Sequence, residues 1–217
     1  MPSMKFLVPV LVIIAALAGP VAAQPTPLPL ANDGGRLVLD TLGQRVTLPR
    51  PEWLGADGTL ADLATTFFFV DGDQASLRIF PRGEGEAFWS TVYGVRVSRS
   101  PAPVLKDFRA LVIESYARGC RPETVALFQL EPDNGEDIPP LGFVCGAYRP
   151  EASVDPGKGE VMVVGFYKSA TGMAMIYQEW RGAAFDAADQ TTWPVSPQRL
   201  EQSFARLRAD AGLARAD

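Results

Sequence analysis

The sequence predicts an α+β protein, a single domain in which an antiparallel β-sheet with a long central hairpin near the C-terminus packs against two helices. Three observations lead to this prediction. Two long apolar runs flank a short connection within residues 160–182, the pattern of a long hairpin. Several shorter apolar segments are separated by turn residues, which indicates antiparallel strands. Two further segments repeat apolar residues at three- and four-residue steps, which indicates helices. About nine strands and two helices are expected.

The chain begins with the pattern of a cleaved secretory signal. Lys5 is followed by an apolar run over residues 6–18, and Pro20 interrupts it before small residues that end at Ala23. Signal peptidases accept such small residues, so we predict cleavage after residue 23 and export to the periplasm or the medium. The run is shorter than the roughly 20 apolar residues of a membrane span, so no stable membrane anchor is expected after cleavage.

The first half of the mature chain predicts a leader and then strands. Residues 24–35 are rich in proline and turn formers and predict a flexible leader, so the folded domain is expected over residues 36–217. Residues 36–49 and 64–80 each alternate around a glycine-containing turn and predict two hairpins. Residues 87–98 predict a fifth strand.

The helical period begins after Pro103. Residues 105–116 predict the first helix, and two strands are expected over residues 124–130 and 141–148. Ser196 is a favourable N-cap with proline directly after it, which predicts the start of the second helix. The apolar positions of the two predicted helices are Leu105, Phe108, Leu111, Val112 and Tyr116 in the first, and Leu200, Phe204, Leu207 and Ala211 in the second.

The long hairpin is expected at the centre of the sheet. A connection over residues 169–172 pairs Lys168 with Met173. One face then carries Met162, Val164, Phe166, Met173, Met175 and Tyr177, and the other carries Val161, Val163, Tyr167, Ala174, Ile176 and Trp180. A hairpin with one solvated face alternates apolar and polar residues. Because both faces here are apolar, we expect both to be covered.

The composition excludes several kinds of chemistry. The 217 residues include no histidine, which rules out Ser-His-Asp and Cys-His catalysis and histidine-ligated zinc. A net charge of −5 without a basic run argues against nucleic-acid binding. Residues 83–85 lack the third glycine of a dinucleotide loop. The acidic segments 71–73 and 133–137 are interpreted as turns and not as calcium loops. No cofactor and no metal are therefore expected.

Cys120 and Cys145 are the only cysteines. An even number of cysteines in an exported chain favours pairing, so we predict a disulfide between them. The 24 residues between them are unlike the spacing of a Cys-x-x-Cys redox motif, so the bond is expected to be structural.

The best candidate binding residues lie on the long hairpin: Tyr167, Lys168, Tyr177, Trp180 and Arg181. Tryptophan, tyrosine and arginine anchor interfaces because each buries a large area while keeping a polar group available. The alternative is that Trp180 packs in the core beneath the second helix and Arg181 pairs with an acidic neighbour.

Two other functions remain open. A hydrolase built on two carboxylates would use Glu179 as one of them, although the end of a strand is also a common place for an exposed glutamate. A carrier of a small apolar ligand would use the adaptable side chains of Met162, Met173 and Met175, which otherwise belong to an ordinary core.

The order of segments resembles a group of exported bacterial proteins over the range Phe88–Ala209. The resemblance rests on Phe88-Trp89, an amphipathic helix, a strand pair with a cysteine, and the hairpin that holds Tyr167-Lys168 and residues 177–181. The layout also looks like the Mog1/PsbP type of α+β sandwich, whose members are mainly accessory and binding proteins. The resemblance implies a non-catalytic periplasmic binding or accessory module with an unknown protein or small-molecule partner.

Overall fold

The computed structural model describes residues 28–54, 65–99, 104–135, 137–151 and 156–216. The predicted signal peptide, residues 1–23, and the start of the predicted leader lie outside this part of the chain. The described strands are β1 (Leu30–Asp33), β2 (Arg36–Thr41), β3 (Gln44–Pro49), β4 (Thr65–Asp71), β5 (Gln74–Phe80), β6 (Thr91–Ser98), β7 (Val125–Gln129), β8 (Leu141–Cys145), β9 (Lys158–Lys168), β10 (Met173–Ala183) and β11 (Gly212–Arg215). The helices are α1 (Leu105–Ala117) and α2 (Pro197–Asp210), with short 3-10 turns η2 (Pro122–Thr124) and η3 (Gln190–Thr192).

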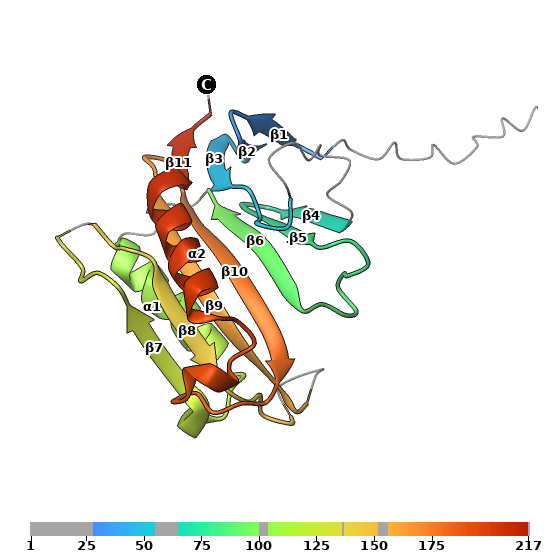
Figure 1. The fold of residues 1–217 in the computed structure, drawn as a ribbon. Coiled ribbons are helices and arrows are strands. Elements are labelled where there is room, and N and C mark those ends of the chain that lie inside the picture. The colour runs from blue at the N-terminus through green and yellow to red at the C-terminus, as the bar shows by residue number, and fades with distance from the viewer. Residues whose placement is uncertain (1–27, 55–64, 100–103, 136, 152–155, 217) are drawn as a thin grey trace, which may run out of the picture.

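The strands form two antiparallel sheets. The larger sheet has the order β4-β5-β6-β10-β9-β8-β7, and the smaller has the order β1-β2-β3-β11. Figure 1 shows α2 lying along the front of the larger sheet, with the smaller sheet beside it at the top. Both ends of the described part belong to the smaller sheet, in which β1 and β11 are the two outer strands.

The main core lies between the larger sheet and the layer formed by α2 and the smaller sheet. Leucines and valines of β2 and β3 pack there with the inner residues of β5, β6, β9 and β10. The helix α2 contributes three of its predicted apolar positions, which are buried: Leu200, Phe204 and Leu207. The fourth, Ala211, follows the last residue of the helix and is half-buried. Its start is also as predicted, since the Ser196 hydroxyl accepts a hydrogen bond from the backbone N–H of Arg199.

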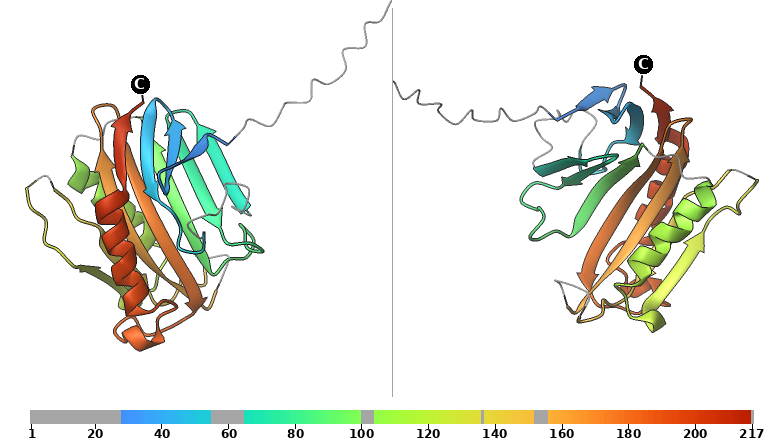
Figure 2. Two further views of the ribbon diagram at one scale, coloured as in Figure 1. Left: turned by 45° about the horizontal axis from the view of Figure 1, so that its top comes forward. Right: turned by 180° about the vertical axis from the view of Figure 1, so that it is seen from behind.

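A second core lies on the opposite face of the larger sheet, beneath α1. The buried side chains of β8, β9 and β10 there include Phe143, Met162 and Phe166, and Phe108 and Tyr116 of α1 pack on them. From behind, Figure 2 shows α1 over the β8 and β9 side, with no helix over β5 and β6. That half of the face is therefore where the sheet can present side chains to a ligand.

The prediction for the long hairpin is confirmed. Lys168 pairs with Met173, and the register continues to Lys158 and Ala183. Except for Met173, which is buried but belongs to neither core, the two predicted sets of side chains divide between the two cores, and within these sets only Tyr167 is half-buried. The hairpin is buried on both faces because it occupies the middle of the seven-stranded sheet.

The predicted α+β class is wrong, because the protein is mostly β. Strands account for 47% of the described residues and helices for 19%. The cover over the α2 face is largely a second sheet, and two of its strands, β1 and β11, were not predicted. The segment Leu30–Asp33, expected in a flexible leader, pairs with Leu39 and its neighbours in β2.

Smaller differences concern the ends of elements and one helix face. The strand expected from Ala87 begins at Thr91, and the residues before it form a loop. Leu111 was expected on the buried side of α1 but is 65% exposed. Among the described residues, no helix is long and apolar enough to cross a membrane.

Candidate functional site

The five predicted hairpin residues are not brought together. Trp180 is 2% exposed and packs in the core on the α2 face. Tyr167 donates a hydrogen bond from its hydroxyl to the carbonyl oxygen of Leu207 at 2.8 Å, and with Lys168 it lines a cavity of about 730 Å³ at the hairpin tip. Tyr177 and Arg181 instead line a cavity on the α1 face.

The cavity on the α1 face is lined by a cluster of charged and aromatic side chains. It has a volume of about 560 Å³ and lies at the end of α1, over β5, β6 and β10. An adjoining cavity of about 430 Å³ shares Arg78, Arg96 and Tyr177 with it, so the two form one groove. We call the 560 Å³ cavity the α1-face pocket. Its polar and aromatic lining is Arg78, Phe80, Glu86, Trp89, Arg96, Tyr116, Tyr148, Glu160, Tyr177, Glu179 and Arg181.

One wall of the α1-face pocket is a closed ion pair. Arg181 of β10 lies opposite Glu160 of β9 in the hairpin register, and its Nη2 is 2.6 Å from Glu160 Oε1. Tyr148 is also hydrogen-bonded to Glu160. The guanidinium carbon of Arg181 lies 3.7 Å from the centre of the Trp89 ring, a cation–π contact. Glu160 is therefore a partnered carboxylate, and Arg181 pairs with an acidic neighbour as one of the two sequence-based interpretations proposed.

Glu179 is the least satisfied group of the pocket. It was interpreted as an exposed strand end, but it is only 6% exposed, because α1 and the loop before β6 enclose this end of β10. Its Oε1 has no hydrogen-bond partner. Burial, and then repulsion from Glu160, raise the pKa of Glu179 to about 8, against a smaller opposing effect of a hydrogen bond with Tyr116. The carboxyl is thus mostly protonated at neutral pH.

The floor of the pocket is Tyr177, whose ring lies on the backbone of β6. Gly94 pairs with Tyr177, and a Cβ at Gly94 would lie 2.1 Å from the Cζ of that ring. Only glycine therefore allows the ring to lie flat there. The Tyr177 hydroxyl is hydrogen-bonded to Arg96, and burial raises the pKa of the tyrosine so that it stays protonated.

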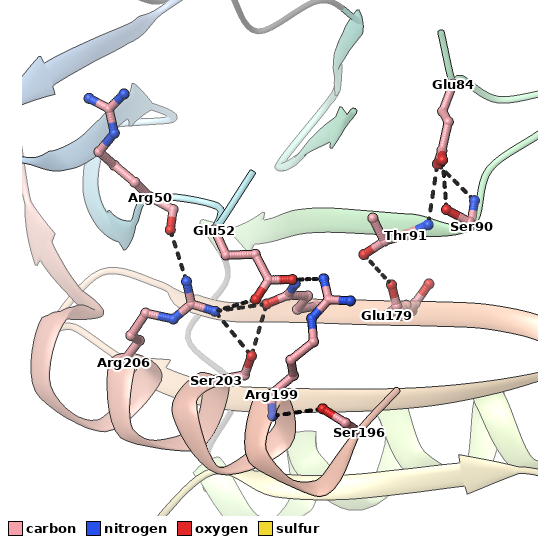
Figure 3. Close-up of polar contacts among 11 residues, drawn as sticks. Arg50, Glu52, Glu84, Ser90, Thr91, Glu179, Ser196, Arg199, Ser203 and Arg206 are labelled. Carbon is pink, nitrogen blue, oxygen red and sulfur yellow. Dashed lines mark hydrogen bonds and ion pairs between the residues drawn. The ribbon is translucent and has the colours of Figure 1, made fainter. Parts of the chain in front are cut away.

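The loop that closes the pocket is held by a carboxylate. Glu84 accepts hydrogen bonds from the backbone N–H of Ser90 at 2.7 Å and from its hydroxyl at 2.6 Å. The next residue, Thr91, donates from its hydroxyl to the carbonyl oxygen of Glu179 at 3.0 Å. Figure 3 shows this chain of contacts from Glu84 to the strand that carries Glu179. These bonds fix the position of Trp89 beside the pocket.

The opposite face of β10 carries a polar network that joins α2 to the segment after β3. The Gln178 side-chain oxygen accepts from the Ser203 hydroxyl at 3.0 Å and from Arg206 at 3.3 Å. Glu52 forms ion pairs with Arg199 and Arg206. Figure 3 shows these groups converging from the helix and the loop. The network links elements in the packed layer and is a structural feature.

The predicted disulfide is present, and it lies beside the pocket. The sulfurs of Cys120 and Cys145 are 2.11 Å apart. Cys120 lies two residues after Arg118, the C-cap of α1, and its backbone forms an isolated β-bridge with Tyr148. Cys145 lies in β8, opposite Glu160 of β9. The disulfide therefore links the end of α1, which carries Tyr116, to the strands beside the Arg181–Glu160 ion pair.

In the acidic turn of residues 133–137, both aspartates are paired with arginines. Hydrogen bonds from Arg109, and then from Gln129, hold the pKa of Asp133 well below its usual range. Hydrogen bonds from Arg208, with N–O distances of 2.6 and 2.7 Å, likewise lower the pKa of Asp137. Within the described ranges, no group of three or more acidic or cysteine side chains could hold a metal ion.

Sequence analysis missed most of the pocket, although one signal was available. With Lys168 opposite Met173, Glu160 falls opposite Arg181, and Glu179 points to the same face of the hairpin. Charged residues within two otherwise apolar strands thus indicated a polar site on this face of the hairpin. Arg96, Tyr116 and Trp89 come from elements distant in sequence, so no local pattern places them there.

Comparison of the chain with models of known protein families, with characterised proteins and with solved structures gave no match.

Proposed function

We propose that the protein is an exported, non-catalytic binding or accessory module and that a small polar ligand binds in the α1-face pocket. One observation carries this proposal. Glu179 is more than nine-tenths buried, and its Oε1 lacks a partner while the residue lines a cavity large enough for a small molecule. A buried polar atom without a hydrogen bond destabilises a protein by about 1–3 kcal/mol, and a ligand that supplies the bond recovers that energy. The pattern of residues 1–23 supports a periplasmic location.

The experiment is recovery of the ligand from its natural compartment. The protein is purified from periplasmic extract without denaturation, and the small molecules released on unfolding are identified by mass spectrometry. We expect a retained compound with the wild type and with Arg82→Ala, a matched control at an exposed arginine outside the pocket. We expect loss of that compound with Arg96→Ala. Wild-type protein that retains nothing, even after incubation with concentrated extract, would contradict the proposal.

A carboxylate-based hydrolase is the second candidate, favoured by the placement of Glu160 and Glu179 on neighbouring strands of one face. A protonated acid beside an ionised carboxylate is the arrangement of glycoside hydrolases. Binding is favoured because Glu160 is already engaged by Arg181 and Tyr148, so it is not available to attack a substrate or activate water. Release of an unaltered compound from the wild type would support binding, and release of its hydrolysis products would support the hydrolase.

The carrier hypothesis receives less support. Met162, Met173 and Met175 are each 1% exposed, and Met162 and Met175 pack in the core beneath α1. Their close packing supports the interpretation of these residues as ordinary core.

A further inference from the structure

The charges of the α1-face pocket are matched except at two groups. Arg78 pairs with Glu86 at 2.8 Å, and Arg181 pairs with Glu160 at 2.6 Å. No carboxylate among the described residues lies within ion-pairing distance of Arg96, whose hydrogen bond goes to the Tyr177 hydroxyl. Glu179 is the other unmatched group. One potential cation site and one anion site therefore face the same pocket.

The register of β6 and β10 keeps these two groups apart. Arg96 pairs with Met175, and Val92 pairs with Glu179, so their positions are four residues apart along the strands. At about 3.3 Å per residue, the backbones that carry the two charges are roughly 13 Å apart. Tyr177 lies between them on the same face. A short molecule lying across Tyr177 could therefore reach both charges at once.

We infer that the pocket binds a small aminocarboxylate, whose carboxylate pairs with Arg96 and whose ammonium pairs with Glu179. This inference rests on the proposed function and specifies the ligand class. The arginine guanidinium matches a carboxylate in two parallel hydrogen bonds. An ammonium supplies the hydrogen bond that Glu179 Oε1 lacks. The apolar body of the ligand lies on Tyr177, whose ring is held flat against Gly94.

The pocket fits a sugar less well. Sugars stack on a free aromatic face, whereas Arg181 covers a face of Trp89 at 3.7 Å and Phe80 lies 6.4 Å from the same indole. Tyr148 also has Arg181 5.9 Å from its ring centre. The Trp89 and Tyr148 rings are thus engaged with Arg181, which leaves Tyr177 and the unmatched charges to contact a ligand.

Binding of an ammonium is coupled to release of a proton from Glu179. The charged and titratable groups that face this carboxyl are Tyr116 from α1, Arg96 from β6, Tyr148 from the segment after β8, Glu160 from β9, and Tyr177 and Arg181 from β10. Burial keeps the pKa of Tyr116, Tyr148 and Tyr177 above the neutral range, and Glu160 and Arg181 are paired with each other. Glu179 is thus the group that changes charge near neutral pH. An ammonium favours its ionised form, so the affinity rises with pH up to the pKa of the free site.

The test is calorimetric titration of the full-length mature protein with glycine, 4-aminobutanoate, 5-aminopentanoate and 6-aminohexanoate. Pentylamine and pentanoate carry only one charge each and are the matched controls. We expect at least one aminocarboxylate to bind about tenfold or more tightly than both controls at pH 8. Its affinity should fall by up to about tenfold per pH unit below pH 8, since one pKa unit is a factor of ten in the equilibrium.

Variants assign the two ends of the ligand. Glu179→Gln should remove the pH dependence and the release of a proton, which titrations in buffers of different ionisation enthalpy measure directly. Arg96→Ala should reduce the affinity to that of pentylamine. Glu201→Gln and Arg82→Ala, at exposed positions outside the pocket, should leave both properties unchanged. Melting temperatures confirm that each variant is folded.

Failure of this inference is distinguishable from failure of the proposed function. Two results overturn the ligand class: aminocarboxylates that bind no better than both singly charged controls, or aminocarboxylates that bind to Arg96→Ala and Glu179→Gln as tightly as to the wild type. If the periplasmic preparation still yields a compound that Arg96→Ala loses, the pocket remains the binding site for a ligand of another class. If it yields none, the proposed function fails as well.

Discussion

At the scale of residues, Glu179 determines how the pocket responds to pH. A carboxyl whose pKa is raised in the folded state holds its proton more tightly there than in the unfolded chain. The contribution of the Glu179 carboxyl to the free energy of unfolding is therefore complete below its ordinary pKa of 4.5, and it is lost as the pH rises through the folded-state pKa of about 8. Each unit by which the pKa differs between the folded and the unfolded chain corresponds to about 1.4 kcal/mol. The free energy of unfolding is therefore expected to fall by several kcal/mol across this pH range.

Glu179→Gln tests this effect, because glutamine imitates the protonated acid and does not ionise. The free energy of unfolding of the wild type, measured by denaturant titration from pH 5 to pH 9, should fall more steeply than that of Glu179→Gln. Glu201→Gln, at an exposed position of α2, should follow the wild type. Parallel curves for wild type and Glu179→Gln would mean that the carboxyl titrates normally.

Gly94→Ala tests the packing beneath the pocket. The new Cβ would meet the Tyr177 ring at 2.1 Å, so the ring has to leave its place. Overpacking of this kind destabilises by about 1–3 kcal/mol, and the displaced ring should also remove ligand binding. Gly85→Ala is the matched control, since the nearest side-chain atom to its Cβ is at 3.4 Å, an ordinary contact. Equal stability and retained binding in Gly94→Ala would contradict the described floor.

At the scale of elements, α2 holds the sheet faces together and α1 frames the pocket. Phe204 of α2 is 5% exposed and lies 5.6 Å from Phe128, ring centre to ring centre. Phe204→Ala should therefore lower the free energy of unfolding by about 3–5 kcal/mol in denaturant titration. Leu111→Ala is the control, because Leu111 of α1 is 65% exposed and should change stability by less than about 0.5 kcal/mol. A loss in Phe204→Ala as small as that expected for Leu111→Ala would show that α2 is peripheral.

The disulfide links α1 to the strands behind the pocket. Replacing Cys120 and Cys145 together by serine opens a loop with a sequence separation of 25, and chain entropy gives a loss of about 3–4 kcal/mol. The end of α1 should then exchange its amide hydrogens faster than the distant β2–β3 hairpin, which serves as the internal control. Unchanged stability and unchanged exchange near Tyr116 would show that packing alone holds this helix end.

At the scale of the whole molecule, the sequence predicts elements better than it predicts their assembly. The hairpin register follows from a four-residue connection, and it correctly places the side chains of β9 and β10 on their two faces. The second sheet was missed because β1 and β11 have four residues each and too little alternation to be noticed. Their stability comes from pairing with β2 and β3, which is a tertiary effect.

The pocket was hidden for a related reason. Arg96 and Glu179 come to face the same pocket only through the pairing of β6 with β10, two strands about eighty positions apart in the chain. Glu179 was identified as a candidate carboxylate, but its burial depends on α1 and the Trp89 loop. The residues that give this site its charge therefore become visible only when the sheet is assembled.

The central claim is that Arg96 and Glu179 face one ligand pocket across Tyr177. A crystal structure of the protein at pH 8 with the tightest-binding aminocarboxylate of the series tests it most directly. The account predicts ligand density over the Tyr177 ring, with a carboxylate on the Arg96 guanidinium and an ammonium on Glu179 Oε1. A ligand bound elsewhere, or a direct Arg96–Glu179 ion pair that fills the pocket, would contradict it.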